Sequence, residues 1–227
     1  MSAILSRGNN KFFITGTDTG VGKTYISTSL IKSFNALGYS TIGIKPVSSG
    51  CKLQGNSLVN EDALSLQQVS SIYLDYPQVN PFAFERPIAP NIAALQTATD
   101  LSVKNIIQKT QFALTTCADV HIIEGVGGWF VPLNADETMA DYVIQSELQV
   151  ILVVGIRLGC LNHALLTYHA IQNSRAPLVG WIANCFQSEK ERETTAIIAT
   201  LKKWLKIPCL SVVDFQAGVD INNANSG

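Results

Sequence analysis

A glycine-rich segment near the start of the chain, Gly16–Thr24, carries the residues needed to hold nucleotide phosphates. It reads Gly-Thr-Asp-Thr-Gly-Val-Gly-Lys-Thr, follows the apolar run Phe12–Ile14 and leads into an amphipathic stretch. In a loop between a strand and a helix, backbone N–H groups and the helix N-terminus attract phosphate oxygens before any side chain contributes. Lys23 is then expected to neutralise the outer phosphates, and the Thr24 hydroxyl to coordinate Mg²⁺.

The spacing of this phosphate loop differs slightly from the common pattern. That pattern has four residues between its glycines, whereas five separate Gly16 from Gly22, and Thr17 stands where the first glycine is expected. The alternative is a glycine-rich turn that merely joins a strand to a helix. The agreement of strand, loop, Lys-Thr pair and helix favours phosphate binding. The residues expected to contact the nucleotide here are Thr19, Gly20, Val21, Gly22, Lys23 and Thr24.

Apolar strand-like segments alternate with amphipathic helical segments and must position this loop. The predicted strands are Lys11–Gly16, Thr41–Lys45, Asp119–Glu124, Gln149–Val154, Leu178–Ala183 and Pro208–Val213. The alternation predicts right-handed βαβ units and an α/β, P-loop NTPase-like three-layer fold with a mostly parallel central sheet flanked by helices. Gln149–Val154 is the most apolar strand, so we expect it near the centre. Residues 1–227 are expected to form a single domain, with 214–227 a loosely ordered tail.

The composition narrows the class of protein. Hydrophobic residues make up 47% and charged residues 15% of the 227 residues, which suits a sheet covered on both faces. The net charge is −1 and no basic cluster is present, so no nucleic-acid partner is expected. The longest apolar run, Val150–Val154, is too short to span a membrane, and the N-terminus does not resemble a signal peptide. We therefore expect a cytoplasmic protein.

The five cysteines and three histidines do not suggest a zinc site or a disulfide framework. The cysteines are scattered, odd in number and without a Cys-x-x-Cys pair, which favours reduced thiols. His163 and His169 are six residues apart and do not share a helical face.

Two charged residues stand where apolar strands are predicted to end, Lys45 and Glu124. In parallel α/β sheets, ligands bind beyond the carboxyl ends of the strands. Lys45 is therefore well placed for a phosphate or carboxylate, and Glu124 for Mg²⁺, directly or through water. The alternatives are a lysine that snorkels to the surface and a carboxylate that caps a helix. Asp62 alone reads as an acid at a helix N-terminus.

Two further positions indicate a ligand more weakly. Residues 155–162 follow the most apolar strand and open a helix, whose free N–H groups can hold an anion such as a substrate carboxylate. Asn184 ends the fifth strand, where a carboxamide can pair with an adenine edge. An ordinary strand-to-helix turn is the alternative for 155–162. The residues alone thus predict a Mg²⁺-dependent phosphate-binding protein and do not name a second substrate.

Taken together, the motifs resemble the dethiobiotin synthetase family over about Phe12 to Val213. The motifs that carry the resemblance are Gly16–Thr24, Lys45–Gly50, Asn60–Ala63, Val79–Phe82, Glu124–Pro132, Val153–His163 and Gly180–Asn184. The resemblance implies an enzyme that converts 7,8-diaminononanoate, CO₂ and ATP into dethiobiotin, ADP and phosphate. One amine takes up CO₂ as a carbamate, ATP phosphorylates the carbamate, and the second amine closes the cyclic urea.

The resemblance also implies residue roles. Lys23 and Lys45 are expected as catalytic cations, and Thr24, Asp62 and Glu124 as Mg²⁺ ligands. Thr19, Lys45 and Ser49 are expected to contact the diamine and its carbamate, and Asn184 to contact adenine. Cys160, Leu161 and Asn162 are expected to receive the substrate carboxylate across a homodimer interface.

The chain departs from the family pattern at two places. Residue 20 is glycine where some relatives have glutamate, so a role for that acid is missing or supplied elsewhere. The segment after the last strand, Val212–Phe215, lacks the proline-containing loop that relatives place beside adenine. The preference for ATP over other nucleotides is therefore less certain than the chemistry.

Three other functions are compatible with a phosphate loop. An ATPase switch of the partition or cell-division-site class would carry a signature lysine near the start of the loop, where this chain has Thr17-Asp18-Thr19. A related amide-forming ligase would need a glutaminase partner domain, for which 227 residues leave no room. A nucleotide-binding module without catalysis would not need Lys45 and Glu124 beside the site.

Overall fold

The computed structural model describes residue 5, residues 10–185 and 192–214, and residues 217 and 219. Its strands are β1 (Lys11–Gly16), β2 (Thr41–Ile44), β3 (Val47–Ser49), β4 (Lys52–Gln54), β5 (Ser57–Val59), β6 (Phe82–Phe84), β7 (Val120–Glu124), β8 (Gln149–Ile156), β9 (Leu178–Cys185) and β10 (Cys209–Val213). Its helices are α1 (Lys23–Ala36), α2 (Glu61–Val69), α3 (Tyr76–Val79), α4 (Pro90–Gln96), α5 (Val103–Thr115), α6 (Met139–Gln145), α7 (Cys160–Asn173) and α8 (Arg192–Trp204).

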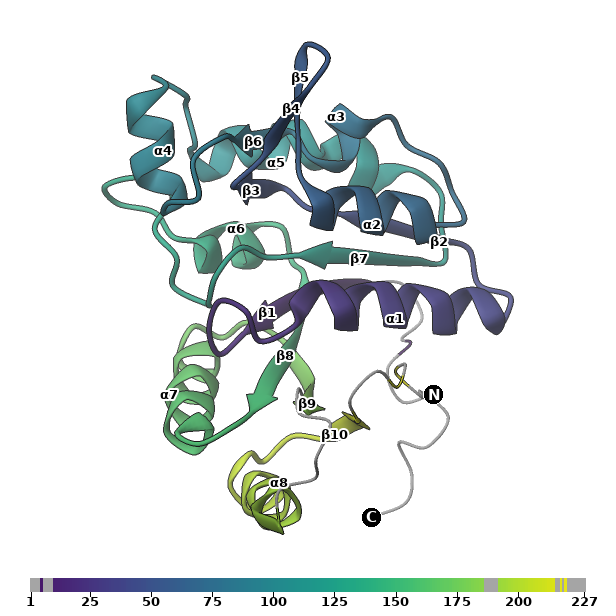
Figure 1. Ribbon diagram of the computed structural model, residues 1–227, viewed down its shortest axis with the longest axis vertical. Helices are drawn as coiled ribbons and strands as arrows, with labels where there is room; N and C mark the ends of the chain where they lie inside the picture. Colours follow the sequence, from purple (N-terminus) through teal and green to yellow (C-terminus); the bar gives the residue numbers. More distant parts are fainter. Residues whose placement is uncertain (1–4, 6–9, 186–191, 215–216, 218, 220–227) are drawn as a thin grey trace.

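Six of these strands form the central sheet, in the order β10-β9-β8-β1-β7-β2 (Figure 1). Every neighbouring pair is parallel, as βαβ connections require. The sheet strands read as continuous apolar runs because helices cover both faces. The predicted three-layer α/β fold is confirmed, and β8 lies in the interior of the sheet as its apolar sequence predicted.

The alternation of side chains along β1 divides the core into two layers. Phe12 and Ile14 face a cluster that contains Ile26 and Leu30 of α1. Phe13 faces the opposite cluster, to which α5, α6, α7 and α8 contribute. In Figure 1, α1 runs along the front of β1, while α7 and α8 lie below it. Burial on both faces fixes the register of β1 and holds the loop that follows it.

Small elements above the main sheet complete the fold. β3 pairs with β6 in parallel, and β4 pairs with β5 as an antiparallel hairpin that projects at the top of Figure 1. These short strands were not predicted, because runs of three residues carry no clear hydrophobic period. β3 directly follows β2, so this second sheet positions the chain beyond Lys45.

The predicted ends of the long elements agree with the structure to within a few residues. β8 and β9 are longer than predicted, because they continue through Ile156 and Cys185. Of the tail 214–227, the structure describes Asp214, Ala217 and Val219, and the rest of that prediction lies outside the described residues. Hydroxyls on α1 donate to the carbonyls of Ala217 and Val219. No helix in the described part of the chain is both long and apolar enough to cross a membrane.

Candidate active site

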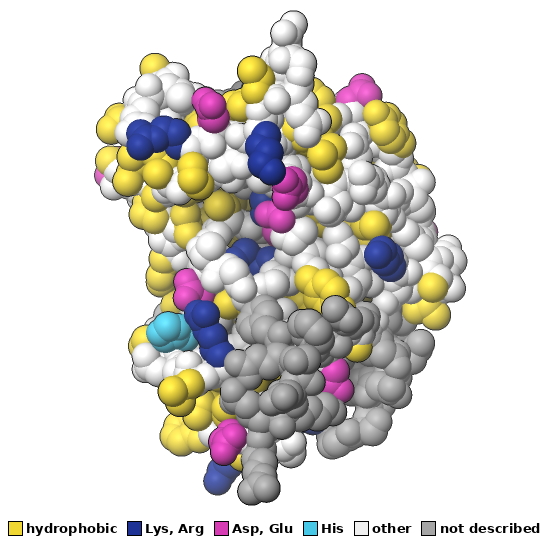
Figure 2. Space-filling view, in the orientation of Figure 1, with side chains coloured by type: hydrophobic (Ala, Val, Ile, Leu, Met, Phe, Trp, Pro, Cys, Tyr) yellow, Lys and Arg dark blue, Asp and Glu magenta, His cyan; other side chains and the backbone are white. Residues whose placement is uncertain are grey.

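A cavity of about 700 Å³ opens at the carboxyl ends of β1, β2 and β7. Its wall contains most of the residues that the sequence singled out: Thr19, Gly20, Gly22, Lys23, Thr24, Lys45, Ser49, Asp62 and Glu124. Figure 2 shows acidic and basic side chains lying together in the middle of this face of the molecule. The position matches the rule that ligands bind beyond the carboxyl ends of parallel strands.

The phosphate loop reaches its shape through glycines. Gly20 and Gly22 have φ angles of 72° and 87°, which side-chain-bearing residues rarely adopt. A Cβ on Gly16 would lie 2.5 Å from Val21 Cγ2, so the turn excludes a larger residue there. Gly22 is also the N-cap of α1 and has no side chain to bond the first N–H groups of the helix. Those donors point to an anion site.

Lys23 projects from the first turn of α1 into this site. Its Nζ donates to the carbonyl of Asp18 at 3.0 Å, which holds the ammonium across the loop. Burial, and then the positive charge of Lys45, lower the pKa of Lys23 to about 8 from its ordinary 10.5. The negative charge of a bound polyphosphate would stabilise this buried ammonium.

Lys45, Glu124 and Asp62 form a charged cluster at the floor of the cavity. Lys45 Nζ lies 2.6 Å from Glu124 Oε1 and 3.3 Å from Asp62 Oδ2. Burial alone would lower the pKa of Lys45, but the two carboxylates outweigh it and raise the pKa above its ordinary value. Lys45 is therefore a buried permanent cation and does not snorkel to the surface. Sequence reasoning alone left Asp62 open, and the structure brings it to the same group.

The oxygens around Glu124 fit a Mg²⁺ ion. Thr24 Oγ1 donates to Glu124 Oε1 at 2.8 Å. The other carboxylate oxygen, Oε2, is buried and has no hydrogen-bond partner among the residues that the structure describes. An orphaned carboxylate oxygen beside a hydroxyl and a second carboxylate, Asp62, is the hard oxygen set that Mg²⁺ prefers. The described residues contain no cluster of three or more His, Cys, Asp or Glu side chains typical of transition metals.

The other two residues predicted to contact the diamine besides Lys45, Thr19 and Ser49, also lie in the cavity wall. Thr19 is exposed at the tip of the phosphate loop, and its backbone N–H donates to Asp18 Oδ1 at 2.7 Å. Ser49 Oγ is buried, and no described residue bonds to it. An unbonded hydroxyl in a cavity wall is available to a ligand.

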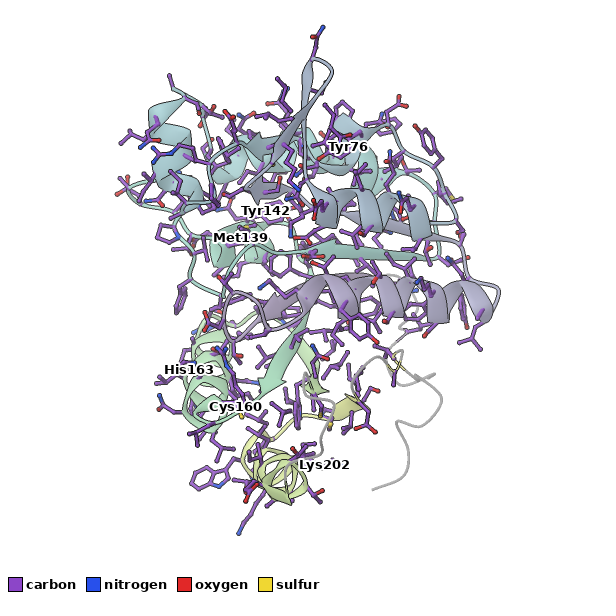
Figure 3. The ribbon with its side chains drawn as sticks, viewed as in Figure 1. Tyr76, Met139, Tyr142, Cys160, His163 and Lys202 are labelled. Atoms are coloured by element: carbon purple, nitrogen blue, oxygen red, sulfur yellow. The ribbon has the colours of Figure 1, made fainter. Side chains whose placement is uncertain are left out.

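Three predicted residues lie away from this cavity. Cys160, Leu161 and Asn162 form the first turn of α7, after Gly159 with a φ of 86°. Figure 3 labels Cys160 on α7, well below the part of the molecule that carries Tyr76. Cys160 is buried, whereas Asn162 is exposed. The structure of one chain therefore does not bring this turn together with Lys45.

Asn184, the predicted adenine contact, also lies outside the cavity wall but touches the phosphate loop. It is the second-last residue of β9, pairs with Gly155 of β8, and donates from its Nδ2 to the carbonyl of Val21 at 3.0 Å. Asn184 therefore holds the backbone of the phosphate loop, and this hydrogen bond was not predicted.

The sequence reasoning missed an ion pair that joins the phosphate loop to the β8–α7 turn. Arg157 Nη2 lies 2.9 Å from Asp18 Oδ2, and both side chains are about half exposed. Asp18 thus contacts Thr19, Lys23 and Arg157 through different oxygens. A carboxylate between two threonines in a glycine-rich loop is a weak signal. The cavity wall formed by Pro87–Pro90 and Pro132 was also missed, since nothing in those residues indicates a ligand.

Comparison with known proteins agrees with this geometry. A family model described as an AAA domain matches residues 10–223. The ATP-dependent dethiobiotin synthetase of Cellvibrio japonicus (strain Ueda107) is 48% identical over 202 residues, covering 89% of this chain and 88% of the relative. The enzyme of the same name from Serratia marcescens is 42% identical over 201 residues, covering 88% of each. Among solved structures, a ParA family ATPase from Chlorobium tepidum TLS has a TM-score of 0.55 at 13% identity, covering 97% of this chain and 94% of that one. This last likeness shows a shared fold and says nothing about activity.

Proposed function

The chain belongs to the family of ATP-dependent dethiobiotin synthetases, which are ligases, and we propose that it makes dethiobiotin from 7,8-diaminononanoate, CO₂ and ATP. The observation that carries the proposal is the buried Lys45 ammonium, held by Glu124 and Asp62 at the mouth of the phosphate loop. A nucleotide-binding module without catalysis has no need of a buried cation at that position.

The proposed reaction has three steps. One amine of the diamine attacks CO₂ and loses a proton, which gives a carbamate. A carbamate oxygen attacks the γ-phosphorus of ATP, so that a carbamic-phosphoric anhydride and ADP form. The second amine attacks the anhydride carbonyl and loses a proton, phosphate leaves with the bridging oxygen, and the cyclic urea closes.

The chain's own residues act mainly through charge and position. The carbamate and the γ-phosphate are both anions, so bringing them into line costs electrostatic repulsion. Lys23 and Lys45 would offset that repulsion and the charge that spreads over the transferred phosphoryl group. Because Lys45 is already fixed by two carboxylates, little reorganisation is needed at the moment of reaction.

Mg²⁺ would be held by Thr24, Asp62 and Glu124, and when bound it would neutralise the charge on the phosphate oxygens. The orphaned Oε2 of Glu124 supports this assignment. Thr19 and Ser49 would contact the diamine and its carbamate, because both line the cavity beside Lys45.

The substrate carboxylate would bind at the first turn of α7, to Cys160, Leu161 and Asn162, from a second subunit. This turn lies outside the cavity of its own chain, so a homodimer with shared sites accounts for its distance. Asn184 would contact adenine beside the loop that it supports. A cytoplasmic location fits an ATP-consuming enzyme whose five cysteines are all thiols.

The test is ADP release in the presence of Mg²⁺ and bicarbonate, with and without 7,8-diaminononanoate, followed by mass analysis of the product. ADP release that requires the diamine and yields a product with the mass of the cyclic urea supports the proposal. ADP release that ignores the diamine would favour a switch ATPase instead.

A further inference from the structure

A polar network lies behind Lys45 and links it to the helix that carries Asp62. Its members are Asn80, Tyr76, Ser48 and the backbone of Asn60. Asn80 lies in Val79–Phe82, one of the stretches that resemble the family, and the resemblance implied no role for it. None of these side chains lines the described cavity.

Asn80 is the centre of this network and is buried. Its Nδ2 donates to the carbonyl of Lys45 at 2.6 Å. Its Oδ1 accepts from Ser48 Oγ at 2.7 Å and from the Tyr76 hydroxyl at 2.9 Å. The Lys45 N–H also donates to the neighbouring carbonyl of Val79 at 2.9 Å, so both backbone groups of Lys45 bond to this segment.

Tyr76 extends the network to α2. The backbone N–H of Asn60 donates to the Tyr76 hydroxyl at 2.8 Å, and the Asn60 side chain caps α2 by accepting from Ala63 N. Asp62 lies in the turn that this cap fixes. The Tyr76 hydroxyl therefore links Asn80, which bonds to the Lys45 backbone, to Asn60, which caps the helix turn that contains Asp62.

We infer that Tyr76 and Asn80 are positioning residues that set the Lys45 ammonium against Asp62 and Glu124. The inference rests on the proposed function for its kinetic consequence. The Lys45 ammonium contacts carboxylates from two other parts of the chain: its Nζ lies 2.6 Å from Glu124 Oε1 and 3.3 Å from Asp62 Oδ2. A displacement of about 1 Å at such a contact is enough to lower turnover strongly. Neither residue touches the reacting atoms.

Tyr76→Phe tests the inference, with Tyr142→Phe as a matched control. Tyr142 is fully buried, and its hydroxyl bonds to Thr110 Oγ1 at 3.2 Å between α6 and α5. Figure 3 labels both tyrosines. Tyr76→Phe is expected to lower kcat about tenfold and to change the KM for ATP less than about twofold. Tyr142→Phe is expected to leave kcat within about twofold, whatever its effect on Tm.

Amide hydrogen exchange gives a readout that does not depend on catalysis. In Tyr76→Phe the amides of Lys45 and of residues 47–49 are expected to exchange about fivefold faster than in the wild type. In Tyr142→Phe the same amides are expected to exchange at the wild-type rate. Ser48→Ala removes the other donor to Asn80 Oδ1. The double variant with Tyr76→Phe is expected to lose more kcat than the two single losses combined, because Oδ1 is then left without either hydroxyl.

The outcomes separate the two proposals. If the wild type makes no dethiobiotin, the proposed function fails, and exchange at residues 45–49 still tests the network. Equal losses of kcat in Tyr76→Phe and Tyr142→Phe would overturn the inference. Unchanged exchange at residues 45–49 in Tyr76→Phe would overturn it as well.

Discussion

Lys45 Nζ lies 2.6 Å from Glu124 Oε1, and both side chains are buried at the carboxyl ends of neighbouring strands. Such a pair adds little to stability by itself, because removing both charges from water offsets most of their attraction. Its value here is a fixed positive charge beside the phosphate loop. Glu124 also accepts from Thr24, so one carboxylate joins the predicted cation site to the predicted metal site.

Lys45→Met is expected to lower turnover by about a thousandfold or more, since it removes charge stabilisation at the reacting phosphoryl group. It should also lower the free energy of unfolding by about 3–5 kcal/mol, because Glu124 is left as an uncompensated buried charge. Adding Glu124→Gln should restore most of that stability and none of the activity. Urea unfolding and steady-state rates measure both quantities. A Lys45→Met variant with turnover within tenfold of the wild type would remove Lys45 from the mechanism.

Lys23 is expected to destabilise the ligand-free protein at neutral pH. Its pKa in the folded protein is about 8, against 10.5 when unfolded, so the unfolded chain holds this proton more tightly. The cost is fully present below pH 8 and disappears as the pH rises from 8 to 10.5. At pH 7 the free energy of unfolding of Lys23→Met should therefore be about 3 kcal/mol higher than that of the wild type.

The difference in free energy of unfolding between Lys23→Met and the wild type should shrink steadily toward pH 10. The variant is expected to be more stable at pH 7 although it cannot turn over substrate. Denaturant unfolding of both proteins at several pH values gives this difference directly. If Lys23→Met is less stable than the wild type at pH 7, or if its gain in stability does not change with pH, then burial does not lower the pKa of Lys23 as described.

Removing divalent cations with EDTA should abolish turnover while changing the Tm of the ligand-free protein by less than about 2 °C. The fold survives because Glu124 keeps Lys45 and Thr24 as partners without a metal. Thr24→Val should raise the Mg²⁺ concentration for half-maximal rate about tenfold or more. Thr28→Val is the control, since Thr28 lies one turn further along α1 and its hydroxyl donates back to the backbone carbonyls of Thr24 and Tyr25. Equal Mg²⁺ requirements in the two variants would argue against Thr24 as a ligand.

Mixing two inactive variants tests whether the sites are shared between subunits. Asn162→Asp places a negative charge where the substrate carboxylate is proposed to bind, and Lys45→Met disables the cavity. In a heterodimer one of the two sites is intact, so an equilibrated equal mixture should regain about a quarter of wild-type activity. Mixing Lys45→Met with Lys23→Met, both in the cavity of one chain, should regain nothing. No recovery in the first mixture would place Asn162 outside the shared site.

Much of the site could be predicted from the sequence because its residues stand at the ends of strands. The phosphate loop, Lys45 and Glu124 each follow an apolar run, and parallel strands bring their carboxyl ends to one edge. Asp62 needed the family resemblance, because an acid at a helix start is common for other reasons.

The remaining contacts depend on tertiary packing and have no local signal. Arg157 and Asp18 are separated by 139 positions, and each is an ordinary charged residue in a loop. Asn80 and Tyr76 lie on a four-residue helix and the turn that ends it, which are too short to show a hydrophobic period. The first turn of α7 was predicted to serve a site shared with a second subunit, and this stays a prediction because the structure holds one chain.

Oxygen tracing tests the central claim that Lys45 and Lys23 serve the phosphorylation of a carbamate. The enzyme is supplied with ¹⁸O-labelled CO₂, diamine, ATP and Mg²⁺, and the released phosphate is analysed by mass before the label exchanges with water. One ¹⁸O atom is expected in the phosphate for each dethiobiotin formed, because the bridging oxygen of the anhydride comes from the carbamate. Phosphate without the label would show that ATP is hydrolysed by water, and the proposed role of the two lysines would be wrong.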